Sequence, residues 1–264
     1  MCVILKTEDF RRNLMKSIPT DRIIEKLDEH LSKNDYDAAE RHLSYWYGEA
    51  EACGDTRGKL TLTNELIGLH RKLGNRDKAL FYADAVISLV SENGLDNTVS
   101  AGTAYVNAAT AYKAFDMAEK AMPLFEKARE IYEKELPEND ARLGGLYNNM
   151  ALALVDLKEF AKADDFYKKA LSVMEKNDRG GLEMAITYLN MATAAECEHG
   201  LEKADDLIAQ MVEKAISLFD EEADATDGYY AFVCEKCATV FGYYGYFMYE
   251  RKLSERAKKI YEGS

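Results

Sequence analysis

Residues 147–171 read YNNMALALVDLKEFAKADDFYKKAL, and this stretch decides the fold. Beginning with the residue just before it, the first half has apolar residues every three or four positions, the spacing of one face of an α-helix: Leu146, Met150, Leu154 and Leu157. A short polar turn follows, and a second helical pattern of about four turns begins near Ala163. The stretch therefore predicts two helices joined by a tight turn.

The same pattern returns at a nearly constant interval along the chain. Five segments align on one alanine, at steps of 40, 42, 42 and 41 residues: YDAAERHL (Ala39), RDKALFYA (Ala79), AEKAMPLF (Ala121), AKADDFYK (Ala163) and EKADDLIA (Ala204). A weaker sixth copy, SERAKKIY, centres on Ala257 after a step of 53 residues, which the acidic insert at 220–228 accounts for. A fixed period of this size is typical of helical-repeat proteins.

Twelve residues before each of these alanines, the first helix of the repeat carries a small or apolar residue. The series is Leu27, Ile67, Ala109, Ala151, Ala192 and Gly245. Small residues are expected where two helices cross closely, because side-chain size sets the distance between the helix axes. We therefore expect the two helices of each repeat to pack at these positions.

The pattern resembles that of tetratricopeptide (TPR) repeats, which are helix-turn-helix units with small residues at fixed positions. The 42-residue period is similar to that of kinesin light chain repeats, and AMPLFEKA at 121–128 and the stretch 147–171 carry the resemblance best. The resemblance implies an all-α fold, a right-handed α-solenoid of antiparallel helix pairs, also called a TPR-like superhelix. It also implies a scaffold that holds a protein or peptide partner.

The repeats divide the chain into a short leading segment and one long array. We expect residues 1–19 to be an N-terminal cap segment, because the end face of a repeat stack needs a cover. Residues 20–264 are predicted to form the solenoid, and the first and last repeats match the pattern least well. The predicted repeats are about 20–55, 56–97, 98–139, 140–180, 181–225 and 226–264.

Asparagines recur at one position of the first helices, which line the concave side of a curved helical array. Asn107, Asn149 and Asn190 lie two residues before the small position, and Asn64 and Asn148 lie three residues before it. An asparagine amide offers one acceptor and two donors, which suits the N–H and C=O groups of an extended peptide. The resemblance implies that these asparagines hold a peptide in the groove. The alternative is that they link neighbouring helices.

Four residues after the small position, the charge changes along the array. Arg71 and Lys113 come first, and Val155, Glu196 and Tyr249 follow. A groove that is basic near its start and acidic further on would orient a polar ligand, although a solvated helix face explains Arg71 and Lys113 equally well. Glu65 stands where the carboxylate clamp of some TPR proteins needs a neutral or basic side chain, so we do not expect a clamp.

Motifs for catalysis or metal binding are incomplete. Cys234 and Cys237 form a CxxC pair without a second pair or an HxxxH, which favours two buried helical cysteines over a zinc site. His30 and His70 occupy equivalent positions of two repeats and are interpreted as packing residues. HExxH, GxSxG, P-loop and GxGxxG motifs are absent. We predict no enzyme, no metal and no cofactor.

Composition narrows the class of partner. The net charge of −13 disfavours binding to nucleic acid phosphates and to anionic lipid surfaces. Five scattered cysteines do not form a disulfide framework, and no apolar run is long enough for a signal peptide or a membrane span. These features predict a cytoplasmic protein whose partner is a protein or a peptide.

An aromatic stretch near the C-terminus leaves two other functions open. Residues 228–250, GYYAFVCEKCATVFGYYGYFMYE, carry nine aromatic residues among 23. Packing in the core or over the end of the array is the main interpretation, and a ligand wall or a self-association surface is the alternative. One alternative function is therefore a homo-oligomerising structural or assembly protein. The other is a peptide-sensing regulator without its own DNA-binding module, because only about 20 residues precede the array.

Overall fold

The computed structural model describes residues 17–178 and 180–263, and it divides into two compact units, residues 1–134 and 135–264. Most of the predicted cap, residues 1–19, lies outside the described residues. Every regular element of the described residues is an α-helix, so the all-α prediction is confirmed.

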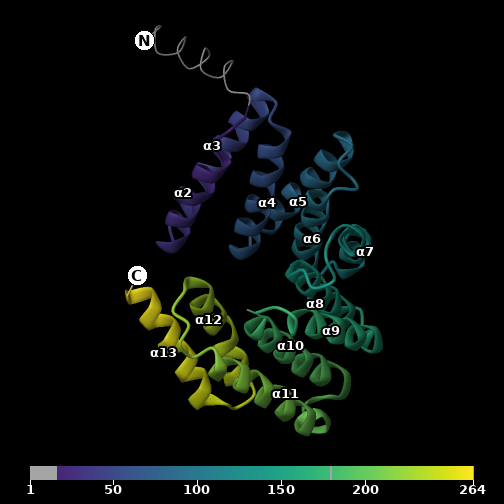
Figure 1. The fold of residues 1–264 in the computed structure, drawn as a ribbon, viewed down its shortest axis with the longest axis vertical. Helices are drawn as coiled ribbons and strands as arrows, with labels where there is room; N and C mark the ends of the chain where they lie inside the picture. Colours follow the sequence, from purple (N-terminus) through teal and green to yellow (C-terminus); the bar gives the residue numbers. More distant parts are fainter. Residues whose placement is uncertain (1–16, 179, 264) are drawn as a thin grey trace. The chain divides into compact units, whose positions relative to one another are not determined.

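Unit 1 contains three successive helix pairs (Figure 1). The first helices of the pairs are α2 (Thr20–Ser32), α4 (Thr56–Lys72) and α6 (Val99–Ala114). The second helices are α3 (Tyr36–Cys53), α5 (Arg76–Glu92) and α7 (Ala118–Glu135). The turns inside the pairs are short, which makes the two helices of each pair antiparallel neighbours.

Unit 2 repeats the same plan with three further pairs. Its first helices are α8 (Ala141–Asp156), α10 (Gly181–His199) and α12 (Gly228–Tyr243). Its second helices are α9 (Phe160–Met174), α11 (Leu201–Glu221) and α13 (Phe247–Gly263). Each unit is therefore a stack of antiparallel helix pairs, the architecture of an α-solenoid.

The turns inside five of the six pairs share one backbone device. Each contains a residue in the left-handed region, with φ between 54° and 84°: Asn34, Gly74, Asp116, Lys158 and Gly245. The N–H of the following residue bonds to a carbonyl five residues earlier, for example from Asn75 to His70 at 2.9 Å and from Tyr246 to Phe241 at 2.8 Å. This bond satisfies a carbonyl that the helix end leaves unpaired and fixes where the first helix stops.

This device shows that the predicted alignment of the sixth copy is wrong. Gly245, predicted to be the small residue of a first helix, lies in the turn between α12 and α13 with φ +84°. We call the alanine on which the repeat segments align the anchor alanine. It follows the left-handed residue by five positions in four of the other pairs, and in the last pair that position holds Glu250. Ala257 instead lies seven positions further along α13. The small residue of α12 is then Ala238, which is buried.

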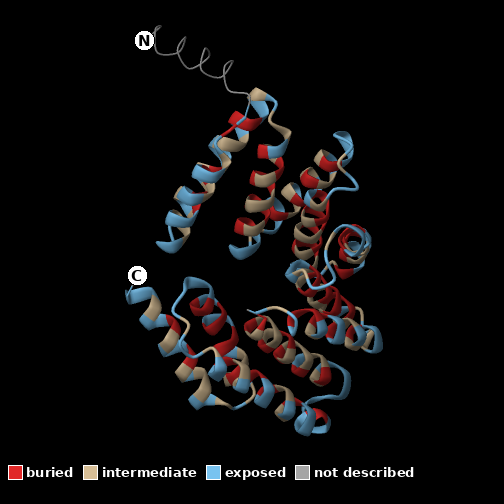
Figure 2. Ribbon diagram, viewed as in Figure 1, coloured by how far each residue is buried: buried red, intermediate tan, exposed pale blue. Residues whose placement is uncertain are grey.

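The core of each unit follows the predicted alanines. Ala39, Ala79, Ala121 and Ala163 are fully buried, and Ala204 is nearly so. The predicted crossing residues Ala109, Ala151 and Ala192 are also fully buried. Figure 2 shows the buried parts of the helices in red, mainly on the sides that face neighbouring helices. The repeating alanines therefore set the close packing of the helices.

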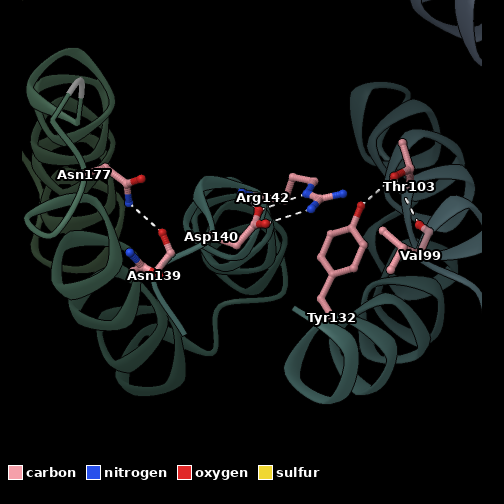
Figure 3. Close-up of polar contacts among 7 residues, drawn as sticks. All are labelled: Val99, Thr103, Tyr132, Asn139, Asp140, Arg142 and Asn177. Carbon is pink, nitrogen blue, oxygen red and sulfur yellow. Dashed lines mark hydrogen bonds and ion pairs between the residues drawn. The ribbon is translucent and has the colours of Figure 1, made fainter. Parts of the chain in front are cut away.

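Two glycines allow an even closer approach seven residues before the crossing alanines. A Cβ atom added to Gly102 would lie 2.5 Å from the ring of Tyr132 in α7, and one added to Gly144 would overlap the Met174 Cε atom in α9. The Tyr132 ring is fixed further by a 2.8 Å hydrogen bond between its hydroxyl and that of Thr103 (Figure 3). The rigid Tyr132 ring therefore leaves no room for a side chain at Gly102, whereas the flexible Met174 side chain could move away from one at Gly144.

Polar contacts also define the start of unit 2 (Figure 3). Asp140 caps α8 by accepting the Arg142 N–H at 3.0 Å, and its carboxylate binds the Arg142 guanidinium at 2.7 and 2.9 Å. The Asn177 amide, which follows α9, donates to the Asn139 carbonyl at 2.8 Å. The loops at this end of the α8–α9 pair are thus held by side-chain hydrogen bonds.

Candidate functional site

The first helices of unit 1 bring two predicted groove residues together. The Asn107 Nδ2 atom, on α6, donates to the Asn64 Oδ1 atom, on α4, at 3.0 Å. Both residues are half-buried. The two helices are neighbours in the stack, so this bond links consecutive repeats.

Unit 2 contains the same arrangement in the same register. The Asn190 Nδ2 atom, on α10, donates to the Asn148 Oδ1 atom, on α8, at 3.1 Å. In both pairs the acceptor lies three residues before the small position of its repeat, and the donor lies two residues before that of the next repeat. The recurrence indicates that the repeat itself, rather than a local accident of packing, produces the contact.

Asn149, the third of the asparagines predicted two residues before the small position, makes a different contact. The Asn149 Nδ2 atom donates to the carbonyl of Gly145, one turn earlier in its own helix α8, at 2.9 Å. No asparagine pairs with it among the described residues of unit 2, where α8 is the first helix. The structure therefore brings Asn107 to Asn64 and Asn190 to Asn148, and it leaves Asn149 as a single member.

The paired amides retain hydrogen-bonding capacity. Asn107 and Asn190 each use one N–H, which leaves one N–H and the Oδ1 acceptor without a partner among the described residues. Asn64 and Asn148 each accept one bond through Oδ1 and keep both N–H donors. Each pair is thus oriented by its internal bond and still presents a donor and an acceptor.

The surface beside each pair is open because of a glycine in the middle of a helix. Gly68 lies one turn after Asn64 on α4, and Gly145 lies one turn before Asn149 on α8. A Cβ atom built at either glycine would meet no atom within 4 Å. Glycine weakens a helix interior, so its presence without a packing reason is informative. Neither glycine is among the predicted groove residues, although an unexplained glycine one turn from a groove asparagine is a usable signal.

The charged residues predicted for the groove lie on the same helices. Arg71 is exposed at the end of α4, and Lys113 is half-buried near the end of α6. Burial raises the pKa of the Glu65 carboxyl on α4, and the nearby Asp28 carboxylate of α2 raises it further. Two carboxyl groups therefore approach each other on the first helices of unit 1, which fits the expectation that a carboxylate clamp is not built here.

Glu196 is less available to a ligand than its position in the sequence suggests. Its carboxylate accepts hydrogen bonds from the hydroxyls of Tyr243 at 2.5 Å and Tyr244 at 2.9 Å, both from the end of α12. At the other end of α10, Glu183 accepts a hydrogen bond from Tyr229. Part of the C-terminal aromatic stretch thus ties α12 to α10. Tyr249, predicted to share the register of Glu196, lies instead on α13 and donates to Asp220 at 3.0 Å.

The cysteines and histidines considered for catalysis or metal binding pack among other side chains and do not form a shared site. Cys234 and Cys237 are buried in α12, and burial raises the pKa of the Cys237 thiol to about 12. His70 is buried against the Tyr82 ring, and His42 bonds to the Ile23 carbonyl at 3.0 Å. The described residues contain no group of three or more His, Cys, Asp or Glu placed to hold a metal. None of their helices is long and apolar enough to cross a membrane.

Part of the chain matches a known repeat family by sequence. Residues 145–177, which include Asn148 and Asn149, match the family model of the tetratricopeptide repeat. No curated protein matches the chain by sequence.

Solved structures share the fold at low sequence identity. BtubC (BKLC) from P. vanneervenii is similar with a TM-score of 0.67 and 18% identity, over 84% of this chain and 86% of that one. The nearly identical TPR-like repeats of a kinesin light chain protein from Podosopora anserina give a TM-score of 0.53 and 15% identity, over 76% and 94% of the two chains. The repeated helix pairs, the matched repeat and these shared folds together support a TPR-type repeat fold for this chain.

Proposed function

We propose that this protein is a non-catalytic scaffold that binds an extended segment of a partner protein along its first helices. A TPR-type fold is that of a protein-interaction scaffold, and the asparagine pairs supply the finer proposal. The observation that carries it is the recurrence of one amide pair, with unused donors and acceptors, in both units. Groups in this arrangement match the alternating N–H and C=O groups of a peptide backbone.

The open glycines favour a backbone ligand. An extended chain needs close access to the helix surface, and Gly68 and Gly145 leave that surface uncovered next to the asparagines. Arg71 and Lys113 on the first helices of unit 1 would then contact acidic side chains of the segment, while the amides contact its backbone. The internal bonds of the pairs reduce the entropy that the amides lose on binding.

The proposal is tested by changing Asn107, Asn149 and Asn190 to alanine together and comparing the partners that the variant and the wild type recover from a native lysate. Each lost hydrogen bond weakens binding by about 0.5–1.5 kcal/mol, so the triple change should reduce recovery roughly tenfold to a thousandfold. Circular dichroism verifies that the variant keeps its helix content.

A matched control shows whether an effect comes from the proposed site or from losing asparagines anywhere in the chain. Asn97→Ala combined with Asn139→Ala removes two exposed asparagine side chains that lie in the loops just before α6 and α8, outside the helices themselves. This control should recover the same partners as the wild type. The proposal is wrong if two results occur together. The first is that the triple variant recovers the same partners as the wild type. The second is that Asn64→Ala and Asn107→Ala lower stability equally, because the amide bonds then only link helices.

A further inference from the structure

The last helix pair of unit 2 carries a second surface that the asparagine site does not use. Residues of α11, of α13 and of the turn before α13 line an open groove of about 920 Å³. We call it the basic groove and define it by Ile216, Phe247, Met248, Arg251, Lys252 and Lys259. Figure 1 shows α13, in yellow, at the end of the helix series of this unit. The groove belongs to second helices, whereas the asparagine pairs belong to first helices.

One end of the basic groove is apolar and exposed. Met248 and Phe247 are 82% and 67% exposed, the highest values among the large apolar side chains of the described residues. They lie at the start of α13, and Ile216 of α11 contributes to the same groove. Apolar side chains that are this exposed beside a groove are typical of an interaction site.

The charged side chains of the basic groove are mostly cationic, with Glu255 as the one acidic residue of its lining. Residues 251–259, RKLSERAKK, carry five basic side chains and one acidic side chain in a chain whose net charge is −13. Four of the basic side chains line the groove: Arg251, Lys252, Arg256 and Lys259. This reversal of charge is local, because the preceding insert at 220–228 contains five acidic residues and no basic residue.

The cations are only partly neutralised. Arg251 contacts Glu255 at 2.7 Å on the exposed surface of the helix, and Lys252 and Arg256 share Asp220 at 2.6 and 3.6 Å. Lys259 forms no ion pair with any described residue. Exposed pairs contribute little to stability, so a partner's carboxylates can replace them at small cost.

We propose that the basic groove binds an acidic segment of another protein that carries an apolar anchor residue. The anchor packs against Phe247, Met248 and Ile216, and the flanking carboxylates pair with Arg251, Lys252 and Lys259. A protein segment fits better than an anionic membrane because the rest of the unit is strongly acidic and a bilayer surface would meet that charge as well. The site is independent of the asparagine pairs, and either proposal can fail without the other.

The test uses the full chain and a fluorescein-labelled peptide in which Phe and Leu stand among Asp and Glu residues. Fluorescence anisotropy measures its binding, and a matched peptide with Lys in place of every acidic residue serves as the control ligand. The acidic peptide should bind and the lysine peptide should not. Lys259→Glu should weaken binding at least about tenfold, and Met248→Ser should weaken it at least about threefold.

A matched variant tests whether the groove itself is responsible. Lys258→Glu makes the same charge change one residue away on α13, at an exposed side chain outside the groove. It should change the affinity less than about twofold. Equal losses in Lys258→Glu and Lys259→Glu would show non-specific attraction and overturn the proposal.

Two further results would also overturn it. One is a dimer in sedimentation equilibrium that Lys259→Glu dissociates, because the groove would then bind a second copy of this chain. The other is binding to phosphatidylserine vesicles that exceeds binding to the acidic peptide. Asn107→Ala with Asn190→Ala should leave peptide binding in the basic groove unchanged, which keeps this test separate from that of the asparagine site.

Discussion

At the scale of single residues, His70 has the least satisfied polar side chain among the described residues of unit 1. It is 1% exposed, and neither ring nitrogen has a hydrogen-bond partner. Its ring stacks on Tyr82 with a centroid distance of 5.6 Å and an interplanar angle of 2°. Burial lowers the pKa of His70 below its ordinary value of 6.5; the Glu40 carboxylate opposes this shift, and Lys78 adds to it.

This lowered pKa predicts a pH-dependent stability. The unfolded chain binds a proton at His70 more readily than the folded chain does, so stability falls as the pH drops through 6.5 towards the folded pKa. The loss is at most about 1.4 kcal/mol per pH unit. Trp46, the single tryptophan, lies in unit 1, so its fluorescence reports urea unfolding there.

His70→Phe provides the comparison, because it keeps a ring against Tyr82 and removes the titrating group. The variant should lose less stability than the wild type between about pH 7.5 and pH 5.5. Parallel stability curves for the two proteins would contradict the assignment of this pH dependence to His70.

The sequence predicts where the groove asparagines lie but not what they bond to. Polar residues that recur at one helical position share a face, which is why Asn64, Asn107, Asn148 and Asn190 were identifiable. The distance and rotation between neighbouring helices decide whether two amides meet, and one sequence does not supply these quantities. For the same reason, the sequence predicts Glu196 in the acidic part of the groove but does not predict that the hydroxyls of Tyr243 and Tyr244 bind it.

At the scale of helices, the turn residues decide the register. The five regular copies, which are separated by four steps, were predicted because their anchor alanines keep a nearly constant distance from the turns. The sixth failed because SERAKKIY resembles an anchor segment, whereas the left-handed turn at Gly245 places Glu250 at the anchor position. Left-handed backbone is common at glycine but occurs here also at Asn34, Asp116 and Lys158, so the turn is hard to locate from composition alone.

Two glycines in the helices of unit 1 should respond to alanine in opposite ways. Gly68→Ala adds a methyl group in open space and removes a weak helix former, so it should stabilise the protein by about 0.5–1 kcal/mol. Gly102→Ala forces a methyl group to within 2.5 Å of the Tyr132 ring and should destabilise it by about 1–3 kcal/mol. Urea unfolding followed by circular dichroism measures both changes.

The opposite signs are the informative part of this experiment, since helix propensity alone predicts the same gain at both positions. A gain at Gly102 would mean that α6 and α7 do not approach as closely as Tyr132 indicates. A loss at Gly68 would mean that the surface beside Asn64 is covered, which would also remove one argument for a bound backbone there.

At the scale of the whole molecule, the repeat pattern predicts a single array, and the packing divides it into units 1–134 and 135–264. The sequence gives no sign of this division, because the step from Ala121 to Ala163 is 42 residues, like the step before it. Continuity of the array across the two units stays a prediction. Each unit nevertheless carries its own asparagine pair, so each is expected to contribute to binding.

Site-specific photo-crosslinking tests the central claim, that partners bind along the first helices, most directly. Benzoylphenylalanine in place of Gly68 or Gly145 puts the probe in open space beside the asparagines of each unit. The same probe in place of Ser88 on α5 or Ser172 on α9, both exposed on second helices, is the matched control. The account predicts partner adducts from Gly68 and Gly145 and far fewer from Ser88 and Ser172. Adducts that form only from the second helices would contradict it.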